Sequence, residues 1–151
     1  MNRLRKFRHL SYEEKRLFIL AVVSMSISRV ALLVWSLPEI VGMIARTNAG
    51  KINGRKVPQD GSIDLHRAAR IIDLSSGYSL LPTTCLSRTM AAYFVLSRLG
   101  YSSTPGIGVS KVGGKFAAHA WLECEGGVVI GTRSPDGDTY QPLGSLARFF
   151  A

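Results

Sequence analysis

The first part of the chain carries apolar residues at a helical period. Between Leu17 and Ala45 nearly every position is apolar or small, and one stripe recurs three or four residues apart: Leu17, Leu20, Ala21, Ser24, Ile27, Ala31 and Val34. This spacing predicts a helix that packs its stripe against a core. Pro38 then suits the first turn of a short second helix, where the N–H that proline lacks would be unpaired anyway.

The apolar run is interrupted by Arg29 and by the pair Pro38-Glu39. A membrane-spanning helix needs about 20 largely uncharged residues. We therefore expect packing helices here, while association with a membrane surface and a spanning or exported segment stay open as alternatives.

The middle of the chain first loses and then regains the helical pattern. Residues 46–61, RTNAGKINGRKVPQDG, are rich in glycine, asparagine and basic side chains, which predicts a loop or linker. Ser62 resembles an N-cap with Asp64 in the first turn, and a helix is predicted to run to about Leu74. Its apolar stripe is Leu65, Ala68, Ala69 and Ile72, and Ser75-Ser76-Gly77 ends it.

A further helix and three strands are predicted after Pro82. Thr83 or Thr84 can cap a helix from Cys85 to about Leu99, with Leu86, Met90 and Phe94 on one stripe and Gly100 as its stop. The period then changes to alternation in residues 107–112, 115–124 and 128–131, which are separated by glycine-containing turns. The pattern predicts an α+β fold in which the last helix precedes a three-stranded antiparallel meander.

Composition limits the class of protein. The chain has 151 residues, of which 46% are hydrophobic, so it suits one domain with a sizeable core. Nineteen Lys and Arg against ten Asp and Glu give a net charge of +9, which suits an acidic peptide, an anionic membrane or a nucleic acid. The basic residues are spread out and accompany no nucleic-acid motif, so we expect no nucleic-acid partner. Two cysteines are too few for a disulfide scaffold, and three histidines leave little material for a zinc site.

Two residues could carry nucleophilic chemistry. Cys85 opens a predicted helix, where unpaired backbone N–H groups and the helix dipole favour negative charge. His119 lies mid-strand in AAHAWLEC, and the alternation of a strand places Cys124 on the opposite face from it. Cys85 is therefore the better nucleophile for His119. The plainer interpretation of each residue is a small buried cysteine and a structural histidine.

These segments together resemble a known family. CLSRTMAAYFVLSRLG at 85–100, a strand near GIGVSK, FAAHAWLECEGG at 116–127 and YQPL at 140–143 resemble the transglutaminase-like leader peptidases of lasso-peptide biosynthesis, the stand-alone second B proteins. The resemblance implies N-terminal helices packed on a small papain-like or transglutaminase-like core. It also implies a cysteine peptidase that removes the leader from a ribosomally made precursor, so that a separate cyclase can close the macrolactam.

The resemblance assigns residue roles and partners. Cys85 matches the family nucleophile and His119 the general base. The acidic third position of the family corresponds to Gly131-Thr132 here, which leaves Asp136, Asp138 or a group other than a carboxylate to orient the imidazole. The partners implied are the precursor's leader region, a small leader-recognition protein and the cyclase.

The same pair of residues could instead transfer an acyl group to an amine, as transglutaminases and acyltransferases do. A non-enzymatic adaptor that binds a peptide or a membrane is a third hypothesis. The chemistry requires no metal or organic cofactor. We expect a single domain over 1–151, with a helical part at 1–50 that completes the burial of a core at 60–151, and a cytoplasmic location with membrane association as an alternative.

Overall fold

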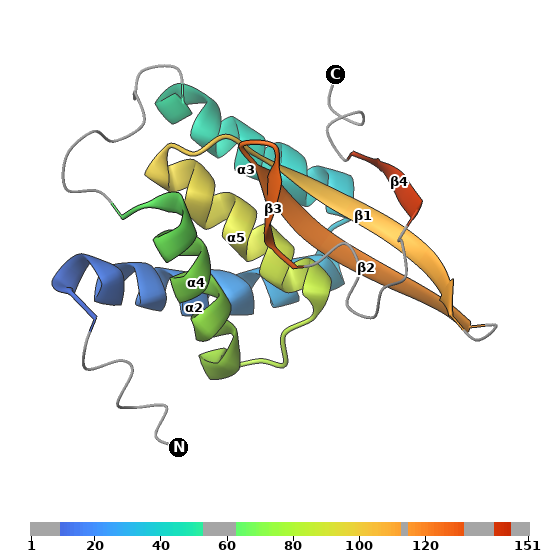
Figure 1. Cartoon of the computed structure of the whole chain (residues 1–151), viewed down its shortest axis with the longest axis horizontal. Helices are drawn as coiled ribbons and strands as arrows, with labels where there is room; N and C mark the ends of the chain where they lie inside the picture. Colours follow the sequence, from blue (N-terminus) through green and yellow to red (C-terminus); the bar gives the residue numbers. More distant parts are fainter. Residues whose placement is uncertain (1–9, 53–62, 113–114, 132–140, 146–151) are drawn as a thin grey trace.

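The computed structural model describes residues 10–52, 63–112, 115–131 and 141–145 (Figure 1). Within them lie the helices α2 (Tyr12–Val34), α3 (Leu37–Ile52), α4 (Leu65–Ser75) and α5 (Cys85–Leu99), with a 3-10 turn η1 (Ser76–Tyr78) after α4. The strands are β1 (Ser103–Val112), β2 (Lys115–Cys124), β3 (Gly127–Ile130) and β4 (Gln141–Ser145). The predicted α+β class is confirmed.

Helix α2 begins at a capping box. The Ser11 hydroxyl accepts from the Glu14 N–H, and the Glu14 carboxylate accepts from the Ser11 N–H at 2.8 Å. Leu17, Ala21 and Ser24 of the predicted stripe are buried, but Ile27 and Val34 are 62% and 67% exposed. The buried face instead includes residues such as Phe18 and Met25. Periodicity could not select this face, because α2 is apolar on all sides and its contacts with α4 and α5 decide which side is buried.

Helix α3 is longer than predicted. The Ser36 N–H donates to the Glu39 carboxylate at 2.7 Å, which ties down the start of the helix around Pro38. The helix then continues through residues 46–52, so the prediction of a loop from residue 46 is wrong. Single turn-forming residues such as Gly50 cost a helix only about 1 kcal/mol, which neighbouring helix formers can offset. Residues 53–62 lie outside the described part of the chain.

The next two helices have side-chain caps. Asp64, rather than the predicted Ser62, is the N-cap of α4 and accepts from the His66 N–H; Ser62 lies outside the described residues. Thr84 caps α5 in a box with Ser87, and Gly100 ends α5 at φ +95°, the left-handed conformation that glycine adopts most easily. The predicted bounds of α5 are confirmed.

The sheet has four strands in the order β3-β2-β1-β4, all paired antiparallel. It is therefore larger than the predicted three-stranded meander, because β4 pairs with β1 at the edge opposite β3. The alternation of apolar and polar residues within a segment cannot predict that the segment will pair with a strand far away in the sequence. The β2–β3 turn places Glu125 at φ 53° and Gly126 at φ 80°, as a two-residue hairpin with positive φ at both positions requires.

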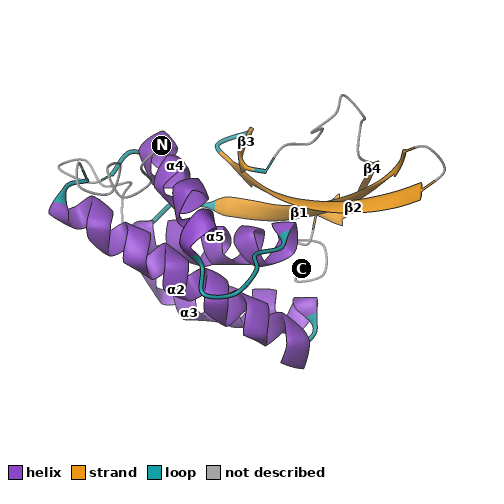
Figure 2. Ribbon diagram, turned by 90° about the horizontal axis from the view of Figure 1, so that it is seen from below, coloured by secondary structure: helices purple, strands orange, loops and turns teal. Residues whose placement is uncertain are grey.

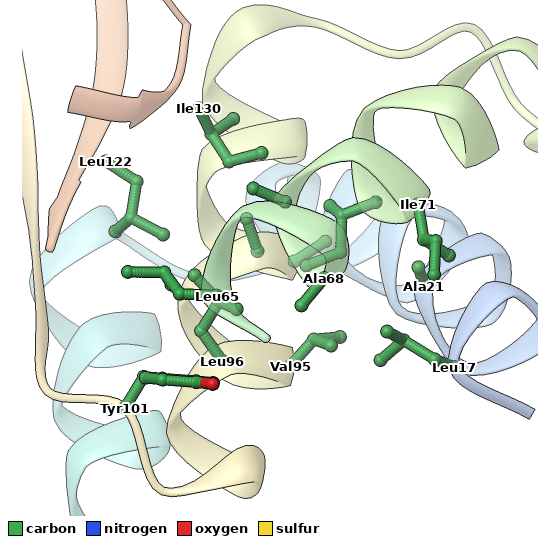
Figure 3. Packing of buried hydrophobic residues seen from close by; sticks show 14 of the residues in the cluster. Leu17, Ala21, Leu65, Ala68, Ile71, Val95, Leu96, Tyr101, Leu122 and Ile130 are labelled. Carbon is green, nitrogen blue, oxygen red and sulfur yellow. The ribbon is translucent and has the colours of Figure 1, made fainter. Parts of the chain in front are cut away.

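One main hydrophobic cluster joins the helices to the sheet. It includes Leu17 and Ala21 of α2, Ala68 of α4, Leu96 of α5 and Leu122 of β2 (Figure 3). A smaller cluster joins α3 to Met90 of α5 and to Ile107 of β1. Figure 2 shows the resulting layers, with the sheet on one side of α5 and with α2 and α3 on the other.

Candidate functional site

Cys85 is the first residue of α5 and follows directly on the N-cap. Thr84 Oγ1 accepts from the Ser87 N–H at 3.2 Å, and the Thr84 carbonyl accepts from the Arg88 N–H at 3.0 Å. The Cys85 carbonyl is held by the Thr89 hydroxyl at 2.9 Å, while its side chain is half-buried. The thiol thus stands at a fixed, accessible position beside the N–H groups of a helix start, where negative charge is stabilised.

The first turn of α5 is anchored to α4. Arg88 donates to the Asp73 carboxylate at 3.1 Å. The segment that enters α5 is more open: Leu80 is 82% exposed, and Leu81 is exposed as well. The segment just before Cys85 therefore exposes apolar side chains to solvent.

Cys124 is chemically different from Cys85. It is buried in the main cluster, and its thiol donates to the Ser102 carbonyl at 3.1 Å. Burial, and next the nearby Glu125 carboxylate, raise the pKa of the Cys124 thiol above its ordinary value. A buried thiol held in its protonated form is a poor nucleophile.

His119 lies in the middle of β2, opposite Gly108 of β1. The side chain is half-buried, and its Nε2 lies 3.3 Å from the position that a Cβ would take at Gly131. Gly131 itself has φ +73°, a conformation that side chains rarely adopt. Gly131 therefore leaves room beside the imidazole at the end of β3.

Trp121 and Glu123 share the sheet face with His119. The Trp121 indole N–H donates to the Glu123 carboxylate at 2.8 Å, and the buried indole lies over Gly106 of β1. Sequence patterns alone assigned no role to this Trp–Glu pair. Two features of the sequence could have indicated the pair. Trp121 and Glu123 are two positions apart in a strand and so share a face, and a glycine on the preceding strand leaves space for a large ring.

The alternation predicted for β2 is confirmed, and it separates the two candidate catalytic residues. Ala120, Leu122 and Cys124 face the helices, since Leu122 and Cys124 belong to the main cluster and Ala120 pairs with Ile107, which packs near Met90. By the alternation of a strand, His119 consequently lies on the other face of β2, opposite the face that packs on the helices. This conformation does not bring the side chains of Cys85 and His119 together.

The remaining candidates are the two aspartates proposed to orient the imidazole and a metal site. Asp136 and Asp138 lie outside the described residues. Among the residues that the structure describes, no group of three or more His, Cys, Asp or Glu side chains could hold a metal ion.

Comparison with known protein families places the chain. The profile of the transglutaminase-like superfamily core matches residues 28–145, which run from the last third of α2 to the end of β4. The chain belongs to the transglutaminase-like superfamily. This membership indicates a cysteine enzyme of the peptidase or acyltransferase type. Searches of the curated proteins and of the solved structures give no match.

Proposed function

We propose that this protein is a cysteine peptidase that removes the leader from a ribosomally made lasso-peptide precursor. The observation that carries the proposal is the position of Cys85, an accessible thiol on the capped first residue of α5 within the superfamily match. The leader as substrate is supported by the resemblance of residues 85–100, 116–127 and 140–143 to the lasso leader peptidases.

The proposed reaction has two steps. The Cys85 thiolate attacks the carbonyl at the leader–core junction, and the core peptide leaves as a free amine that takes a proton from the His119 imidazolium. Water then gives a proton to His119 and attacks the thioester, which releases the leader as a carboxylate. Backbone N–H groups at the start of α5 are suited to stabilise the oxyanion of each tetrahedral intermediate.

The two catalytic assignments have different support. The Cys85 role is supported by its position on α5, by its accessibility and by the burial of Cys124. The His119 role is supported by the resemblance, and it requires a conformation in which the imidazole reaches the Cys85 side of β2. The two residues are therefore tested by separate variants.

The deciding experiment incubates the purified full chain with precursor peptides encoded beside it, with and without the leader-recognition protein. Mass spectrometry locates any cut and distinguishes water from an added amine as the acyl acceptor. We expect cleavage by the wild type and by Cys124→Ala, and no cleavage by Cys85→Ala. Full cleavage by Cys85→Ala would refute the nucleophile, and transfer of the leader to the amine would favour an acyltransferase.

His119→Ala is expected to abolish cleavage while Cys85 remains open to alkylation. Retained cleavage by this variant would remove His119 from the mechanism and leave Cys85 in place. Alkylation of the wild type should modify half-buried Cys85 faster than Cys124, because Cys124 lies in the core. Equal rates would contradict the accessibility on which the nucleophile assignment depends.

A further inference from the structure

The outward face of α2 is apolar and uncovered. Five aliphatic residues spaced three or four apart form what we call the outer stripe, and their exposed fractions run from 44% to 67%: Ile19, Val23, Ile27, Val30 and Val34. Leu33 beside it is 73% exposed. The stripe covers about 22 Å of helix at 1.5 Å per residue. Contiguous apolar surface of this kind on a soluble domain marks a binding surface.

The inner face of the same helix is fully engaged. Phe18, Ala21 and Met25 are buried in the main cluster, and the Glu14 carboxylate accepts a hydrogen bond from Arg67 of α4. By length and apolar composition α2 could cross a membrane, yet only 28% of its most apolar 18-residue window is buried within this fold. A helix that is apolar all round normally has cover on every side. Among the residues that the structure describes, helices and sheet cover the inner side of α2 only.

The charged side chains within the span of the outer stripe are basic. From residue 15 to residue 38 they are Lys15, Arg16 and Arg29, while Glu13, which lies 3.9 Å from Arg16, and Glu39 stand just outside this segment. The chain as a whole carries +9. A second copy of the same chain would bring like charges to this face, whereas an anionic surface would be attracted to it.

Aromatic side chains flank the stripe at both ends. Tyr12, at the first turn of α2, is 72% exposed, and Trp35, just after its last residue, is 48% exposed. Tyrosine and tryptophan favour the boundary between water and lipid, where the ring is apolar and the polar atom stays hydrated. The helix lies on the side of α5 away from the sheet, so its outer face is presented outward (Figure 2).

We infer that the outer stripe of α2 docks the folded protein onto an anionic lipid bilayer, with the helix lying in the plane of the interface. The helix does not span the bilayer in this state, because its inner face stays packed in the core. Apolar side chains supply the insertion, and Arg29 together with the chain's net charge of +9 supplies the attraction to lipid headgroups. This inference is independent of the proposed peptidase function.

Vesicle sedimentation of the full chain tests the inference. The lipids are phosphatidylcholine alone and equal parts of phosphatidylcholine and phosphatidylglycerol. We expect wild-type protein to sediment with the anionic vesicles and much less with the neutral ones. Raising the salt from about 0.1 M to about 1 M should weaken binding, because the screening length falls from about 10 Å to about 3 Å.

Two variants separate the stripe from general stickiness. Ile27→Ser/Val30→Ser should reduce partition into anionic vesicles at least roughly tenfold, since both side chains would lose their burial in lipid. Val128→Ser, a half-exposed apolar position of β3 on the sheet side, is the matched control and should bind as the wild type does. Because the α2 positions are exposed, the thermal midpoint of the double variant should match that of the wild type.

Three results would overturn the inference. Wild-type protein that fails to sediment with anionic vesicles is the first, and a double variant that binds as the wild type does is the second. The third is a lipid-free dimer in ultracentrifugation that the double variant converts to monomer, because the stripe would then be an interface between copies of the chain.

Discussion

Replacing Gly106 with alanine probes the packing on the sheet face that carries His119. A Cβ at Gly106 would lie 2.5 Å from Trp121 Cε2, 2.6 Å from Nε1 and 2.8 Å from Cζ2. Comfortable carbon contacts need about 3.5–4.0 Å. All three atoms belong to one rigid, buried indole, so no flexible side-chain end can yield.

The cost follows from what the indole would lose by moving. Overpacking a well-packed site costs about 1–3 kcal/mol, and displacing Nε1 from Glu123 removes a hydrogen bond worth about 1 kcal/mol. For a chain of this size, each kcal/mol lowers the melting temperature by about 2–4 °C. We therefore expect Gly106→Ala to melt roughly 5–15 °C below the wild type in a thermal scan followed by circular dichroism.

Two further variants show whether the loss of stability in Gly106→Ala comes from the collision with the indole. Gly127→Ala is the control, because a Cβ there meets nothing closer than the Cys124 carbonyl at 3.9 Å and should leave the midpoint nearly unchanged. In a Trp121→Leu background, Gly106→Ala should cost much less, since the ring it collides with is gone. Equal midpoints for Gly106→Ala and Gly127→Ala would refute the steric reasoning.

Three more outcomes follow from the described contacts. The pKa of the Glu14 carboxyl is lowered first by its hydrogen bond from Arg67. The ionised carboxylate therefore stabilises the fold above its unfolded pKa near 4.5, and this contribution is lost as the pH falls through the lower folded pKa. In an acid titration, Glu14→Gln should be less stable than the wild type at pH 7, and the difference in stability should vanish below the folded pKa of Glu14. Thr84→Ala should lower stability by about 1 kcal/mol in urea unfolding through loss of the α5 cap, and an unchanged midpoint would contradict that role. Gly131→Ala should lower the melting temperature by a few degrees, because of its φ of +73° and a Cβ 3.0 Å from a carbonyl oxygen, and should shift the NMR signals of the His119 ring.

Local sequence signals determined several elements of this protein. The bounds of α5, its threonine cap and its Gly100 stop follow from side-chain hydrogen bonds and backbone preferences within a few residues, although the sequence left the cap open between Thr83 and Thr84. The alternation of β2 is equally local, and residue parity alone places His119 and Cys124 on opposite faces of the strand. The apolar stripe of α4 was correct for the same reason, because only one of its faces is apolar.

Tertiary contacts decided the rest. The buried side of α2 depends on α4 and α5, because a helix that is apolar on all sides gives periodicity nothing to choose between. The pairing of β4 with β1 joins segments far apart in the chain, and local alternation carries no record of such partners. The relation of Cys85 to His119 also depends on tertiary contacts. The sequence predicted the helix that begins at Cys85 and the strand that carries His119. Which face of the sheet α5 covers was decided by the hydrophobic cluster, which buries Leu122 and Cys124 of β2 rather than the face with His119.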